Sequence, residues 1–166
     1  YIKAETENIE FYENFKRLEK YIKNNFKVSF DILTENVIDR ETKVNFPADW
    51  IFENSGIKRL KGKTVTEELN LRVVNLDCLF VLKFISCRST DIRDLFMLAP
   101  DIKNKEWVKH EISKKYSFKD KFSKIKEKIT SKQFKDNLQG VYGVIENNTF
   151  EKHIKAILNL EKKQNI

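Results

Sequence analysis

Residues 82–95, LKFISCRSTDIRDL, decide how we expect the second half of this chain to fold. The sequence before the break, residues 75–86, is apolar and predicts a helix with Lys83 in its last turn. Ser89 or Thr90 is expected to cap the next helix, and a proline follows the end of that helix. The stretch therefore predicts two consecutive helices joined by a short break.

Charges of both signs gather at this break. Asp91 and Asp94 are three residues apart in the first turn of the second helix, so they share one face. A carboxylate is favoured at a helix N-terminus, and Lys83 is favoured near the end of the preceding helix. A tight turn would bring these side chains and Arg88 together. Two interpretations stay open: an ion-paired brace that fixes the angle between the helices, or a functional site.

The sequence outside this stretch predicts a small sheet and further helices. Residues 5–24 carry apolar side chains at three- and four-residue steps, which predicts an amphipathic helix. Residues 27–34 alternate between apolar and polar side chains, which predicts a strand with one buried face. The predicted fold class is α+β, a small partial mixed sheet followed by an α-helical bundle. The remaining predicted elements are strands at 57–60 and 69–74 and helices at about 49–53, 104–116, 118–129, 134–140 and 149–161. The expected caps are Asn75 for the helix at 75–86, Ser117 for the helix at 118–129 and Thr149 for the last helix.

The composition predicts one domain or a compact two-lobed one. The 166 residues are 40% hydrophobic, and thirteen Phe against one Met indicate a core filled by rings. No apolar stretch approaches the roughly 18 residues that a membrane span needs, so we expect no membrane partner. Cys78 and Cys87 suit a reduced, cytoplasmic protein, and the two histidines have no metal-ligand spacing. Because Tyr1 is not Met, we expect a fragment of a longer protein.

The net charge of +7 lies entirely in the second half of the chain. Residues 1–98 hold 16 basic and 16 acidic side chains, whereas residues 99–166 hold 16 and 9. Such an excess favours an anionic partner such as nucleic acid, and an ordinary solvated lysine surface is the alternative. Aromatic residues between these lysines have the spacing of a helix core. The predicted phosphate contacts are Lys114, Lys115, Lys119 and Lys121.

The order of the charged residues resembles a known family. Members of the AbiEii-like nucleotidyltransferases, in the polymerase-beta-type superfamily, carry an apolar helix ending in Lys, then Arg, then Asp-x-x-Asp-Leu. The strand at 28–33 also resembles a strand in the later part of the family's sheet that carries a carboxylate side chain. The resemblance covers about residues 27–98. The matching residues of the signature are Leu79, Leu82, Lys83, Arg88, Asp91, Asp94 and Leu95.

The resemblance implies roles for these residues. Asp31 would be a catalytic carboxylate that helps to hold Mg²⁺, and Lys83 would neutralise phosphate charge. Asp91 and Asp94 would orient Lys83 or Arg88, or contact the nucleotide. The resemblance also implies an NTP as substrate, and an RNA or protein as acceptor. A cognate antitoxin or a second copy of the chain is a further expected partner.

The chain departs from the family at the metal-binding segment. No glycine here is followed by serine, and no Asp-x-Asp pair occurs, although the family uses such a segment to bind triphosphate and magnesium. We therefore expect residues 1–74 to be the remnant of a nucleotidyltransferase core and residues 75–166 to be a helical C-terminal lobe. The expected function is support of nucleotide transfer from an NTP to RNA or protein. The alternative is a non-catalytic helical module that binds nucleic acid or protein.

Overall fold

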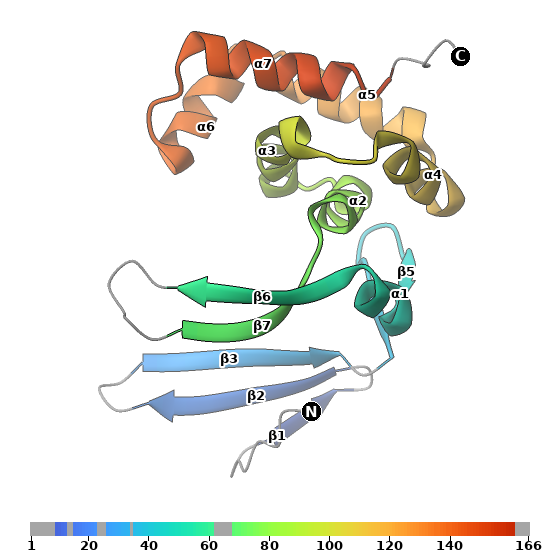
Figure 1. Cartoon of the computed structure of the whole chain (residues 1–166), viewed down its shortest axis with the longest axis vertical. Coiled ribbons are helices and arrows are strands. Elements are labelled where there is room, and N and C mark those ends of the chain that lie inside the picture. The colour runs from blue at the N-terminus through green and yellow to red at the C-terminus, as the bar shows by residue number, and fades with distance from the viewer. Residues whose placement is uncertain (1–8, 13–14, 23–25, 34, 62–67, 162–166) are drawn as a thin grey trace.

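The protein is described from a computed structural model, and the structure describes residues 9–12, 15–22, 26–33, 35–61 and 68–161. For residues 9–33 it describes the backbone of three strands. The class is α+β, as predicted (Figure 1). The strands are β1 (Ile9–Tyr12), β2 (Phe15–Ile22), β3 (Phe26–Leu33), β4 (Asn36–Ile38), β5 (Asn45–Pro47), β6 (Ser55–Lys61) and β7 (Glu68–Val74). The helices are α1 (Ala48–Glu53), α2 (Leu76–Ser86), α3 (Ser89–Leu98), the 3₁₀ turn η1 (Ala99–Asp101), α4 (Lys105–Lys115), α5 (Phe118–Ile129), α6 (Phe134–Tyr142) and α7 (Asn147–Leu158).

The described strands form three small antiparallel sheets. Their orders are β1-β2-β3, β4-β5 and β6-β7, and every described pair is antiparallel. The prediction of one mixed sheet is therefore wrong, because a mixed sheet contains at least one parallel pair of strands. Hairpins join neighbouring strands through short turns, whereas a parallel pair requires a long crossover that this order of strands does not supply.

The helix predicted over residues 5–24 is wrong where the structure describes it. That segment contains β1 and β2, with Ile9 opposite Leu18. β2 then pairs along its whole length with β3, from Phe15 opposite Leu33 to Ile22 opposite Phe26. The strand predicted at 27–34 is confirmed as β3, and its pairing with β2 outweighs the helix-like spacing of the preceding segment.

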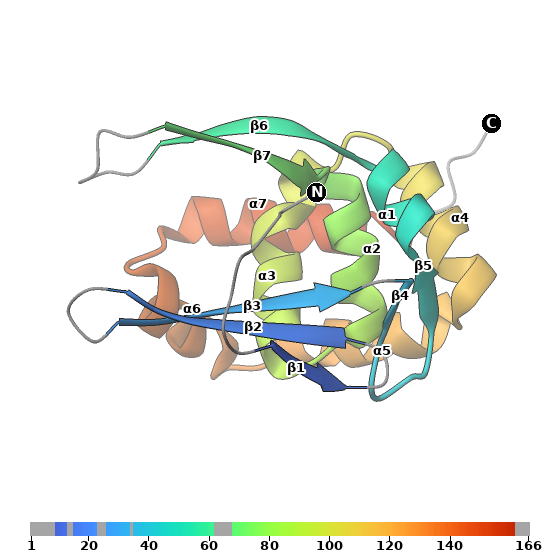
Figure 2. The ribbon, with the colours of Figure 1, turned by 90° about the horizontal axis from the view of Figure 1, so that it is seen from below.

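The core lies mainly in the helical half of the chain. α2 and α3 lie between the strands and the outer helices α5, α6 and α7 (Figures 1 and 2). Side chains of every helix from α2 to α7 are buried in one cluster, to which β5 contributes Phe46. None of the described residues of β6 and β7 is buried, and Ile57 and Leu69 on these strands are 62% and 56% exposed.

Local signals set the beginnings of two core helices. Asn75 Oδ1 accepts a hydrogen bond of 2.7 Å from the Cys78 amide, which confirms the predicted cap of α2. Ser117 Oγ accepts from the Asp120 amide at 3.4 Å, as predicted for α5. The cap predicted at Thr149 is wrong, because α7 begins two residues earlier, at Asn147.

The two cysteines are free and buried. Burial raises the pKa of Cys78 to about 12, so its thiol is protonated near neutral pH. Both residues therefore serve as small apolar side chains. None of the helices in the described part of the chain combines the length and the apolar character that a membrane crossing needs.

Candidate functional site

The turn between α2 and α3 creates the site. α2 ends at Ser86, and Cys87 adopts a left-handed conformation with φ of 51° and ψ of 35°. Its amide donates to the Lys83 carbonyl at 2.8 Å, which closes the helix. Arg88 then returns to extended backbone, and α3 begins at Ser89. One residue in the left-handed region thus reverses the chain and faces the end of α2 with the beginning of α3.

The Asp91 carboxylate, rather than a hydroxyl side chain, accepts the hydrogen bond of the free backbone amide at the beginning of α3. Asp91 Oδ2 accepts from the Arg88 amide at 3.1 Å. The prediction that Ser89 or Thr90 caps this helix is wrong, because Arg88 occupies the capping position and Ser89 is already helical. The backbone donor reaches the carboxylate because Asp91 lies three residues after Arg88. Asp91 is consequently fixed on two sides, by the turn and by Lys83.

Lys83 lies between the two aspartates, as the sequence predicted. Its Nζ is 2.9 Å from Asp91 Oδ1 and 2.7 Å from Asp94 Oδ2. The side chain of Asp91 is only 7% exposed, whereas those of Lys83 and Asp94 are 30% and 33% exposed. An ammonium has three N–H donors, and the two aspartates use two of them. The cluster therefore holds a cation in a fixed position at the edge of the core, with part of its surface in contact with solvent.

The charged state of Lys83 is stabilised by its partners. Burial alone would lower the pKa of the ammonium, but the hydrogen bonds that it donates to Asp94 and Asp91 outweigh burial and raise it. Lys83 is therefore a cation at neutral pH. This state suits stabilisation of negative charge and does not suit a general base.

The structure adds Asp39 to the cluster, a residue that the sequence interpretation missed. Asp39 is 8% exposed, and its Oδ1 is 3.2 Å from Arg88 Nη2. Its Oδ2 accepts from the Thr42 amide at 2.7 Å and from the Thr42 hydroxyl at 2.8 Å. Burial would raise the pKa of Asp39, but the hydrogen bonds from Thr42 and Ser86 and the charge of Arg88 lower it overall. A buried carboxylate thus anchors Arg88 from a segment 49 residues earlier.

Tyr142 is the second residue that was missed. It lies at the end of α6, and its hydroxyl is 2.7 Å from Asp94 Oδ1. Burial and this hydrogen bond to a carboxylate both raise the pKa of the phenol. Tyr142 therefore donates its proton to Asp94 and connects the helical lobe to the cluster. No sequence signal near Lys83 identifies it, because 48 residues separate Tyr142 from Asp94.

The carboxylates of this cluster do not fit a magnesium site. The two oxygens of Asp91 face Lys83 and the Arg88 amide, and the two oxygens of Asp94 face Lys83 and Tyr142. Magnesium needs carboxylate oxygens that are available as ligands. Within the described residues, no group of three His, Cys, Asp or Glu side chains is arranged to hold a metal.

An Asp-x-Glu pair, Asp39-Arg40-Glu41, is present in the chain and was also overlooked in the sequence. This pair does not supply the magnesium ligands that the cluster lacks. Both oxygens of Asp39 accept from Arg88 or Thr42, and Glu41 is exposed. The pair follows β4 and has no Gly-Ser turn before it.

Asp31 lies in β3, opposite Arg17 in the register with β2. Its side chain is outside the described part of the chain. The predicted roles of Asp31 as a catalytic residue and a magnesium ligand therefore stay predictions.

The four lysines proposed for nucleic-acid binding lie at the end of α4 and the beginning of α5. Lys114 Nζ pairs with Glu111 Oε1 at 2.8 Å, and Lys115 Nζ donates to the Asn45 carbonyl at 3.1 Å. Lys121 is 7% exposed, with its Nζ 5.1 Å from the centre of the Tyr116 ring. Lys119 is exposed. Three of the four thus have partners within the protein, and nucleic-acid binding at these positions stays a prediction.

Comparison of the chain with protein-family models, with curated proteins and with solved structures finds no match.

The carboxylate of Asp94 gives the cluster a testable dependence on pH. Burial would raise its pKa, but hydrogen bonds from Lys83 and Tyr142 lower it below the usual 3.8. A lowered pKa stabilises the folded state above the unfolded value, and this stability is lost as the pH falls through the folded value. We expect Asp94→Asn to lower the free energy of unfolding by about 1 kcal/mol at pH 7. As the pH falls below 3.8 and through the lowered folded value, this difference from the wild type should become smaller.

Urea unfolding at pH 7 and at pH 3 measures this difference. Asp101→Asn is the matched control, because Asp101 is exposed and has no ion pair among the described residues. Asp101→Asn should change the free energy of unfolding only slightly at both pH values. An Asp94→Asn effect of equal size at both pH values would contradict the ionic role of Asp94.

Proposed function

We propose that this chain is the supporting half of a nucleotidyltransferase-like protein, which transfers a nucleotide from an NTP to an RNA or protein acceptor. The observation that carries the proposal is the fixed, partly exposed ammonium of Lys83 between Asp91 and Asp94. Nucleotidyl transfer depends mainly on positioning and on neutralisation of phosphate charge. A cation that is held in place needs little reorganisation when negative charge develops near it.

The residues of the cluster have separate parts in this proposal. The remaining N–H of Lys83 donates to a phosphate oxygen of the nucleotide, while Asp91 and Asp94 position the ammonium. Arg88 is 54% exposed and extends the positive side of the cluster, with Asp39 as its anchor. Tyr142 positions Asp94 from the helical lobe. None of these residues is assigned the part of a metal ligand or of the base that activates the acceptor.

The net charge of the cluster is too negative to bind a triphosphate by itself. Two cations and three carboxylates give Lys83, Arg88, Asp39, Asp91 and Asp94 a net charge of −1. A triphosphate therefore needs further positive charge from outside these residues. In the proposal, this positive charge would come from Mg²⁺ held by the Asp-x-Asp segment that the family carries and this chain lacks.

A second candidate function is a non-catalytic binding module. It is favoured by the same hydrogen bonds, because every carboxylate oxygen of Asp91 and Asp94 already has a donor within the protein. In that case the cluster is an ion-paired brace between α2 and α3, and the basic helices bind nucleic acid or a partner protein.

Label transfer distinguishes the two candidates. The intact protein is incubated with each of the four α-³²P-labelled NTPs, together with total cellular RNA or total cellular protein. We expect at least one nucleotide to label one of the two fractions. Absence of label in both fractions with all four NTPs would contradict the transferase and leave the binding module as the better explanation.

A further inference from the structure

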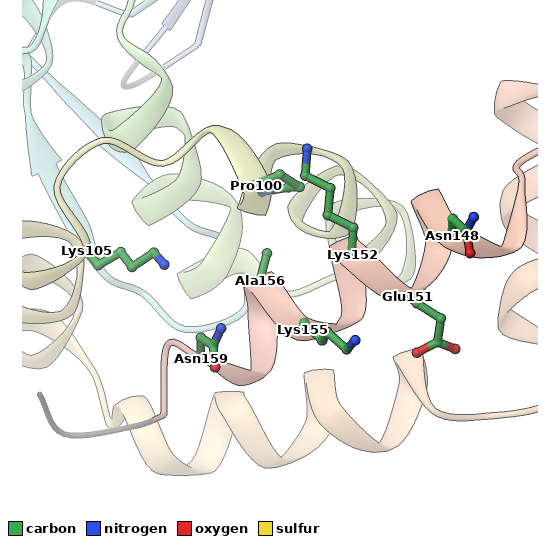
Figure 3. Close-up of a pocket in the computed structure, with 8 residues that line it drawn as sticks. All are labelled: Pro100, Lys105, Asn148, Glu151, Lys152, Lys155, Ala156 and Asn159. Carbon is green, nitrogen blue, oxygen red and sulfur yellow. The ribbon is translucent and has the colours of Figure 1, made fainter.

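An open pocket of about 520 Å³ lies between η1, the beginning of α4 and α7, away from the Lys83 cluster. Figure 3 shows Lys105 extending toward α7, and Lys152 rising from α7 beside Pro100. Lys155 also lines the pocket, and Glu151 is the one acidic residue among those that line it. Three lysines and one glutamate give the lining a charge of +2. We propose that this pocket binds phosphate groups.

The lysines of this pocket have no acidic partner among the described residues, unlike several other lysines of the lobe. Lys114 and Lys126 pair with Glu111 and Glu161. Within the described residues, neither Lys105, Lys152 nor Lys155 forms an ion pair. Their positive charge is thus available to a ligand.

Helix geometry explains why two of these charges converge. Lys152 and Lys155 are three residues apart on α7, so their side chains leave the same face of the helix. Like charges at this spacing destabilise a helix slightly. Glu151 lies four residues before Lys155 on the same helix, but among the described residues it forms no ion pair with either lysine, so it offsets only part of their charge. A bound anion would relieve this repulsion, which gives the pocket a physical reason to prefer one.

The lining indicates which anion fits. The side-chain amides of Asn148 and Asn159 line the pocket and add neutral hydrogen-bond donors to the three ammonium groups. No aromatic side chain is among the described residues that line it, so it has no surface for stacking a base. A site of this composition recognises the charge and the oxygens of phosphate without recognising a base. The phosphate can belong to a nucleic-acid backbone or to a small phosphorylated molecule.

Two probes separate these sources. The first is a fluorescein-labelled 12-nucleotide single-stranded RNA of mixed sequence, followed by anisotropy from 20 to 200 mM salt. The second is inorganic pyrophosphate, followed by calorimetry with the intact protein. Binding of the RNA alone supports a backbone site, binding of pyrophosphate alone supports a small-molecule site, and binding of both supports a site for either source. Absence of binding of both probes at 20 mM salt overturns the proposal.

The variant Lys152→Gln/Lys155→Gln tests whether binding occurs in this pocket. We expect its affinity for the bound probe to fall about tenfold, and the slope of log affinity against log salt for RNA to become shallower by about 1.4. The matched control is Lys124→Gln/Lys128→Gln, which removes two exposed charges from α5. The control should change affinity less than about twofold, because each charge lies outside the pocket. An equal loss in both variants overturns the pocket as the site.

Glu151→Gln gives a result that loss of folding cannot imitate. Removal of the one acidic side chain of the lining raises its charge from +2 to +3. We expect phosphate affinity to rise about threefold, and an unchanged or lower affinity in a folded variant counts against the site. The test does not depend on nucleotide transfer. Phosphate binding without transfer contradicts the proposed function alone, and transfer without phosphate binding contradicts the pocket alone.

Discussion

Lys83→Met is expected to lower the rate of nucleotide transfer by the intact protein by about 10² to 10³. Methionine keeps the unbranched apolar stem and removes the ammonium that lies between Asp91 and Asp94. The loss should appear in the rate with saturating NTP, because the proposed part of Lys83 is stabilisation of charge that develops during transfer. Initial rates of label transfer from α-³²P-NTP measure it.

The same substitution should also lower stability. Asp91 would keep the Arg88 amide as a donor, but its buried carboxylate would lose Lys83. An incompletely paired buried carboxylate costs about 1 to 3 kcal/mol, and solvent at the 30% exposed position of Lys83 moderates this cost. The burial of Asp91 therefore predicts a folded but less stable protein.

Lys83→Met/Asp91→Asn separates the two effects. Asparagine keeps an oxygen that can accept from the Arg88 amide and removes the unpaired charge. We expect the double variant to recover part of the lost stability in urea unfolding while transfer stays low. A rate that recovers together with stability would show that Lys83 is only a brace. An unchanged rate in the single variant would exclude the proposed part of Lys83.

The parts of the fold that were predicted correctly depend on local chemistry. α2 and α5 begin where Asn75 and Ser117 offer side-chain oxygens to the next turn, and such caps are visible within four residues of sequence. The pairing of Lys83 with Asp91 and Asp94 was also within reach, because a short turn joins two consecutive helices.

The parts that were missed depend on contacts outside the segment itself. The helix-like spacing of residues 15–22 is overridden by pairing with the neighbouring strand β3, and the strength of that pairing cannot be read from residues 15–22 alone. Asp39 and Tyr142 reach the site from 49 and 48 residues away in the sequence. Their positions depend on how β4 and α6 pack, which periodicity within either segment does not specify.

Phe96→Ala is expected to lower the free energy of unfolding by about 3 to 5 kcal/mol, the largest effect on stability that we predict. The Phe96 ring is fully buried, and its centre lies 5.2 Å from that of Phe134 on α6 and 5.1 Å from that of Phe150 on α7. The His153 ring stacks on it at 5.2 Å, and His153 Nδ1 is 2.9 Å from the Phe96 carbonyl. Removal of the ring leaves a cavity where three helices meet.

Because Phe96 contacts α6 and α7, its removal should affect both proposed sites. α6 carries Tyr142 to Asp94, and α7 carries Lys152 and Lys155 to the pocket. Urea unfolding followed by circular dichroism measures the loss. Phe52→Ala is the matched control, since Phe52 is 60% exposed and its main contact is Arg72, 4.0 Å from the ring centre. The control substitution should lower the free energy of unfolding by less than about 1 kcal/mol. A cost for Phe96→Ala no larger than that of the control would mean that α6 and α7 do not depend on this ring for their packing against α3.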